Sequence, residues 1–91
     1  MKRRVLLTQM ILGESGKVVG FTGNLNQIGL LMAKGLKIGA RINMDHMPNP
    51  GMPIIIQYGN SKLPVEEELA AKVIIEIDDL PPENFTLKNL D

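Results

Sequence analysis

The chain has 91 residues, no cysteine, and ten cationic against ten acidic side chains, so its formal net charge at pH 7 is zero. This length suits one small domain over residues 1–91, and the lack of cysteine excludes disulfides and thiolate metal sites. A neutral chain whose aromatic residues are Phe21, Tyr58 and Phe85 has neither the basic field nor the stacking platform that nucleic-acid binding needs, so we expect no DNA or RNA partner.

The N-terminal sequence MKRRVLLTQMIL places three cations ahead of a mostly apolar run. Thr8 and Gln9 interrupt that run and no small-residue cleavage site follows, which favours a strand over residues 5–12 rather than a secretory signal. No apolar run approaches the roughly 20 residues that a spanning helix needs. We therefore expect a cytoplasmic protein without membrane insertion.

The next stretch, GESGKV at residues 13–18, has the Gly-Lys pair of a nucleotide-binding loop. The GxxxxGK[ST] pattern of such loops requires a glycine and a hydroxyl at the positions that Ile11 and Val18 occupy here. We therefore interpret residues 13–16 as a tight hairpin turn between the first strand and a second over residues 18–22.

Alternation of apolar and polar residues is clearest over residues 36–45 and indicates a half-buried strand there. Further strands are predicted over residues 28–32, 54–58, 73–78 and 85–90. One short helix is compatible with PVEEELAAK at residues 64–72, and an extended loop is the alternative. The predicted fold is all-β: a small antiparallel barrel of six to seven strands with at most one short helix.

The stretch GNLNQIGLLM places Asn24, Asn26 and Gly29 at positions i, i+2 and i+5, directly before an apolar segment. It resembles the D/N-x-S-x-x-G element of the PilZ family, bacterial domains that bind cyclic di-GMP on a six-stranded antiparallel barrel. The order of the surrounding segments is also similar. The resemblance implies a nucleotide site in which Asn24 and Asn26 hydrogen-bond the ligand, Gly29 permits its approach, and Arg3 and Arg4 fold over it.

The sequence departs from that family where ligand-binding members carry R-x-x-x-R. Four residues after the cations at positions 2–4 stand Leu6, Leu7 and Thr8, so the second arginine is missing, and Asn26 stands where the family has serine. Each lost charge-assisted bond costs about 1.5–3 kcal/mol. The resemblance therefore implies an adaptor in bacterial cyclic di-GMP signalling with weak or lost nucleotide binding, which acts through a protein partner and carries no cofactor.

Residue chemistry indicates a protein that is not an enzyme. His46 is the single histidine, its neighbour Asp45 points to the opposite face of a strand, and Ser15 and Ser61 fall in predicted turns. The alternative to nucleotide signalling is a protein-interaction barrel, with a sheet edge open to strand addition or Met47 and Met52 as a docking surface, or an oligomeric structural barrel.

Overall fold

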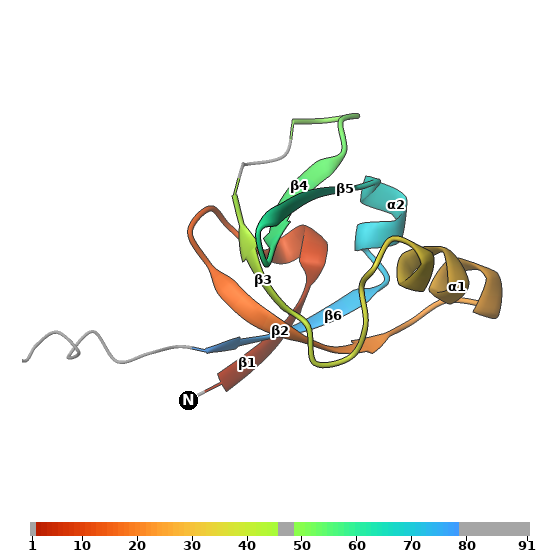
Figure 1. Cartoon of the computed structure of the whole chain (residues 1–91), viewed down its shortest axis with the longest axis horizontal. Coiled ribbons are helices and arrows are strands. Elements are labelled where there is room, and N and C mark those ends of the chain that lie inside the picture. Colours follow the sequence, from red (N-terminus) through yellow and green to blue (C-terminus); the bar gives the residue numbers. More distant parts are fainter. Residues whose placement is uncertain (1, 46–48, 79–91) are drawn as a thin grey trace, which may run out of the picture.

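The computed structural model describes residues 2–45 and 49–78, and it shows one six-stranded sheet curled into a small barrel (Figure 1). All neighbouring strands of this sheet pair antiparallel. The strands are β1 (Lys2–Leu6), β2 (Ser15–Phe21), β3 (Arg41–Met44), β4 (Ile54–Tyr58), β5 (Ser61–Val65) and β6 (Val73–Asp78). The predicted fold class, a small antiparallel β-barrel, is confirmed.

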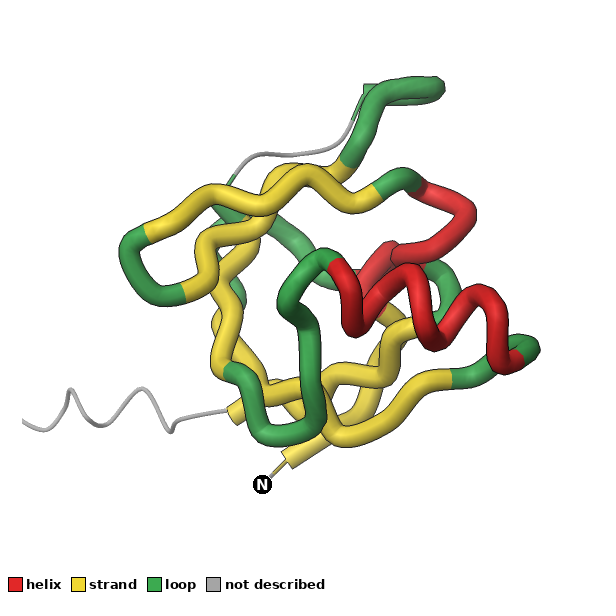
Figure 2. Tube along the Cα trace, turned by 45° about the vertical axis from the view of Figure 1, so that its right-hand side comes forward, coloured by secondary structure: helices red, strands yellow, loops and turns green. Residues whose placement is uncertain are grey.

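Short helices connect several of these strands. The 3-10 helix η1 (Leu7–Gln9) follows β1, α1 (Leu25–Ala33) follows β2, and α2 (Glu67–Ala70) joins β5 to β6. In two views the helices α1 and α2 lie on the same side of the barrel (Figures 1 and 2).

The strand order is β1-β6-β2-β3-β4-β5, so β6 lies between β1 and β2. Ile75 of β6 faces Val5 on one side and Val18 on the other. Residues 13–16 therefore do not form the predicted hairpin turn, because β1 and β2 are not neighbours. Instead η1 redirects the chain, Gly13 adopts φ +90°, and Gly16 lies within β2.

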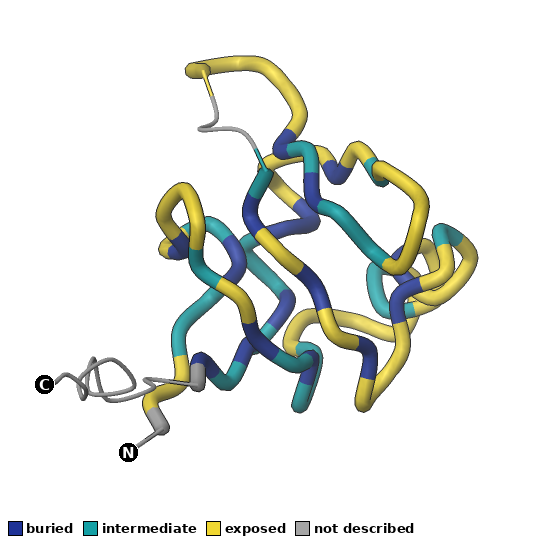
Figure 3. Tube along the Cα trace, turned by 60° about the vertical axis from the view of Figure 1, so that its left-hand side comes forward, coloured by how far each residue is buried: buried dark blue, intermediate teal, exposed yellow. Residues whose placement is uncertain are grey.

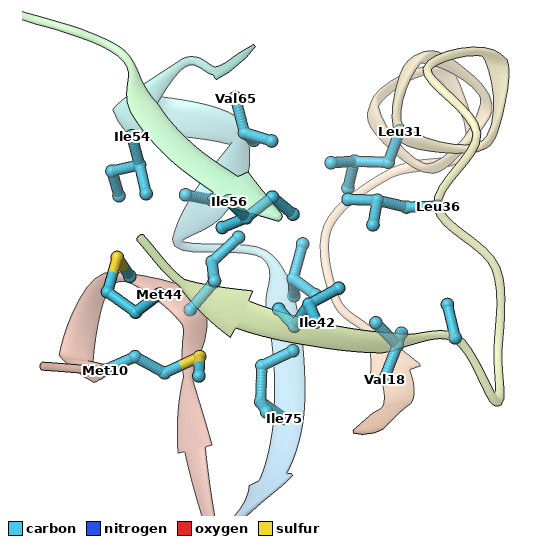
Figure 4. Close-up of a cluster of buried hydrophobic side chains, with 14 of the residues drawn as sticks. Met10, Val18, Leu31, Leu36, Ile42, Met44, Ile54, Ile56, Val65 and Ile75 are labelled. Atoms are coloured by element: carbon cyan, nitrogen blue, oxygen red, sulfur yellow. The ribbon is translucent and has the colours of Figure 1, made fainter. Parts of the chain in front are cut away.

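The core is apolar, and within the described residues no polar or charged side chain is buried. Alternate residues of the strands supply most of it, so buried positions alternate with half-buried or exposed ones along the strands (Figure 3). Its members are Leu7, Met10, Val18, Leu31, Leu36, Ala40, Ile42, Met44, Ile54, Ile56, Val65, Leu69, Ala70, Val73, Ile75 and Ile77. Figure 4 shows side chains from β3, β4 and β6 meeting there.

Two predicted strands are wrong in extent because the backbone turns inside them. The predicted strand over residues 5–12 ends at Leu6, whose N–H donates to Gln9 Oε1 at 2.7 Å as η1 begins. The predicted strand over residues 36–45 begins only at Arg41, because Gly39 has φ +94° and forms a turn. Leu36 and Ala40 are nevertheless buried, as their alternation predicts.

Residues 28–32 are helical rather than extended, since they belong to α1. In the stretch 64–72, Pro64 and Val65 belong to strand β5 and the short helix α2 follows, so the helix is the alternative that the structure supports and the extended loop is wrong. The strands predicted over 54–58 and 73–78 are confirmed. The strand predicted over 85–90, like His46 and Met47, lies outside the described residues.

Candidate protein-binding surface

Helix α1 begins with a reciprocal cap. Asn24 Oδ1 accepts the N–H of Gln27 at 2.8 Å, and Gln27 Oε1 accepts the N–H of Asn24 at 3.1 Å. This is a capping box, which satisfies two backbone donors that the helix leaves unpaired. An asparagine followed three residues later by glutamine, just ahead of an apolar run, is the sequence signal that identifies this helix.

The helix ends in an equally regular way. Gly35 adopts φ +105° and donates to Met32 O at 2.9 Å, while the N–H of Leu36 donates to Leu31 O at 3.2 Å. These two bonds form a Schellman motif, which requires the left-handed backbone that glycine adopts without strain. The motif also brings Leu31 and Leu36 together, and both point into the core (Figure 4).

The outward side of α1 is uncharged. Leu31 is its single buried residue, whereas Leu25 is 86% exposed, Leu30 50% and Met32 51%. Because successive residues turn by about 100°, Gly29 and Ala33 lie opposite Leu31, between those larger side chains. We call Leu25, Asn26, Gly29, Leu30, Met32 and Ala33 the α1 face, of which Asn26 is the polar member. A helix on a soluble domain normally turns charged or polar residues outward, so this face is an exposed apolar patch of the kind that marks interaction sites.

Neither packing nor backbone conformation within the described residues requires a glycine at position 29, in the middle of α1. A Cβ added there would meet no atom within 4 Å, and its φ is not positive. Glycine in a helix interior costs about 1 kcal/mol relative to alanine. Neither close packing nor backbone strain within the described residues offsets that cost.

The residues predicted to hold a nucleotide are not brought together. Arg3 pairs with Glu14, and Arg4 Nε lies 3.5 Å from Glu76 Oε2. Arg4 of β1 and Lys17 of β2 both pair with Glu76 of β6, so Arg4 lies beside the start of β2. Asn24 follows the other end of β2. The four steps along the strand from residue 17 to residue 21 alone span about 13 Å.

The amide of Asn24 is used by the helix cap, and Asn26 and Gly29 lie exposed on α1. The predicted cluster of cations and asparagines is therefore split between opposite ends of the sheet. A role for these five residues in ligand binding stays a prediction.

Both edges of the sheet are short and blunted. The outward N–H of Leu6 on β1 is occupied by Gln9. On β5, the two-residue loop 59–60 sets the register, so Lys62 and Pro64 turn their backbone outward, and proline has no N–H to offer. Blunting of this kind opposes strand addition, which makes the α1 face the stronger interaction surface.

A pocket of about 240 Å³ lies beside the loop that contains Met52, and is lined also by Gly51, Pro53, Glu66 and Glu67. The two glutamates precede and begin α2. Among residues 2–45 and 49–78, no three histidine or carboxylate side chains are grouped to hold a metal ion. Within the same ranges, no helix has the length and apolarity that crossing a bilayer requires.

Comparison with known proteins identifies the family. The profile of the FeoA domain matches residues 5–77, which is most of the barrel. The chain belongs to the FeoA domain family. A crystal structure described as an iron uptake regulatory protein, FeoA, superposes with a TM-score of 0.76 at 32% identity, covering 84% of this chain and all of that one.

More distant structures share the fold alone. A FeoA-like protein from Clostridium acetobutylicum has a TM-score of 0.73 at 19% identity, covering 85% of this chain and 90% of that one. A manganese-dependent transcriptional repressor has a TM-score of 0.76 at 10% identity, and the match covers 86% of this chain but only 44% of the repressor. No curated protein sequence matches the chain.

Membership of the FeoA domain family overturns the resemblance to PilZ domains, and with it the expected role in cyclic di-GMP signalling. The physical reason lies in GNLNQIGLLM, which carried the resemblance. Its asparagine caps a helix and its glycine sits inside that helix, so the segment is not a ligand-binding turn before a strand. The alternative, a protein-interaction barrel without a nucleotide, is closer to these findings.

Proposed function

We propose that this FeoA-domain protein is a cytoplasmic, non-catalytic module that supports iron uptake by docking on a protein of the uptake system. The observation that carries the proposal is the likeness to the iron uptake regulatory protein, which extends over the whole of that chain at 32% identity. The proposal includes no cofactor and no nucleotide.

The described geometry supports binding rather than chemistry. Within residues 2–45 and 49–78 no polar side chain that a reaction would use is buried, whereas the α1 face is exposed. A rigid barrel that holds an uncharged helix outward suits a docking role, because apolar surface gains free energy when a partner covers it.

The test is iron accumulation in cells of the source organism from which this gene has been deleted. We expect deletion to lower uptake of radioactive iron from iron-poor medium several-fold, and we expect a plasmid copy of the gene to restore it. The proposal fails if deleted and undeleted cells accumulate iron at the same rate. Uptake of radioactive manganese is the control, and it should not change.

A further inference from the structure

We propose that the α1 face binds one helix of a partner protein, whose apolar ridge packs over Gly29 and whose flanking carboxylates meet Lys34 and Lys37. This inference rests on the proposed docking function and specifies the chemistry of the partner. It starts from the observation that the outward side of α1 is uncharged and, apart from Asn26, apolar, with a small residue at its centre.

The small residues at the centre of the α1 face favour a helix as the binding partner. Gly29 and Ala33 are one helical turn apart, with Leu30 and Asn26 on one side of them and Leu25 and Met32 on the other. Small residues four apart let the backbone of a second helix approach closely. Such a close approach also accounts for Gly29, since the space above it is open and a larger side chain would fill it.

The positive charge near the α1 face favours a partner helix with acidic residues beside its apolar side. Residues 15–44 contain Lys17, Lys34, Lys37 and Arg41 and no aspartate or glutamate. Lys34 forms the C-terminal cap of α1, and Lys37 is exposed on the loop that follows.

A second copy of this chain is a poorer occupant. A helix of nine residues is about 13.5 Å long, so its face is smaller than the roughly 800 Å² per partner of a standard interface whatever covers it, and charge complementarity distinguishes the occupants. Two copies would also bring the same lysines together without a carboxylate between them. A lipid surface is a poorer occupant as well, because the α1 face has no aromatic residue to anchor it.

The experiment is a titration of the isotope-labelled full chain, followed by amide chemical shifts. The probe is a synthetic helix of about 18 residues, or five turns, with leucine and alanine along one side and glutamate on both flanks. A second peptide carries lysine in place of glutamate. We expect the glutamate peptide to shift the amides of residues 24–38 and to bind at least tenfold more tightly than the lysine peptide.

Two variants separate docking from folding. Gly29→Gln replaces glycine by a better helix former in open space, so it should raise the melting temperature by about 2–5 °C while weakening peptide binding at least tenfold. Met52→Gln changes an exposed side chain outside α1, 57% accessible, and should leave binding within twofold of the original.

Several outcomes would overturn the inference. They are equal binding of the two peptides, no shifts at about 1 mM peptide, or unaltered binding by Gly29→Gln. Binding to phosphatidylglycerol vesicles in place of the peptide, or self-association through α1 in ultracentrifugation, would assign the surface to lipid or to a second copy. None of these measurements involves iron. If peptide binding fails, the proposed role in iron uptake is still tested separately by the gene deletion.

Discussion

Gly16 in β2 shows how one residue limits the packing of the sheet. A Cβ built there would lie 2.5 Å from Ile75 Cγ2 and 2.7 Å from the backbone oxygen of Glu76. A side chain can rotate away from such a contact, but the backbone of the central strand β6 cannot. The glycine that suggested a nucleotide loop is therefore required for strand packing.

We predict that Gly16→Ala destabilises the fold by about 1–3 kcal/mol, as overpacking of a filled site does. Gly20→Ala in the same strand is the matched control, because its nearest neighbour would be Ile74 Cδ1 at an ordinary 3.5 Å. Urea unfolding of both variants measures the difference. Equal midpoints for the two would show that β2 and β6 are not as close as described.

At the scale of the element, α1 depends on its ends. It has nine residues and a single buried side chain, and isolated helices shorter than about 12–15 residues are marginal in water. The capping box at Asn24 and the Schellman motif at Gly35 therefore supply much of what holds α1 in place.

We predict that Asn24→Ala lowers the free energy of unfolding by about 1 kcal/mol, the usual cost of a lost N-cap. Amide exchange within α1 should accelerate at the same time. Asn26→Ala is the control, since this second asparagine is exposed and bonds to no described neighbour in the cap. If the two substitutions have the same effect, the cap does not hold the helix.

The same elements show what the sequence could predict. The strands over 54–58 and 73–78 were predictable because bulky β-branched residues dominate them and glycine or proline lies close to their ends. Residues 28–32 were misassigned because their apolar side chains suit a strand as well as a helix, and periodicity cannot separate the two over so short a run. The cap formed by Asn24 and Gln27 decides the question.

At the scale of the whole molecule, the prediction of a small antiparallel barrel was right, although its strand order was not readable. The pairing of β6 with both β1 and β2 joins residues 52 to 76 positions apart, and no local pattern encodes such a contact. The candidate site was missed for a related reason. Both sides of α1 carry apolar residues, and only the structure shows which side packs against the core and which side is exposed.

Our central proposal is that this FeoA-domain protein binds a protein of the iron uptake system through the exposed α1 face. Leu30→Gln on α1 and Ile11→Gln elsewhere on the barrel change side chains of similar exposure, 50% and 57%. The decisive measurement is radioactive iron uptake by deleted cells that carry each variant, with equal protein levels verified. We predict that Ile11→Gln restores uptake fully and that Leu30→Gln restores less than half of it, whereas equal restoration by both variants would contradict the account.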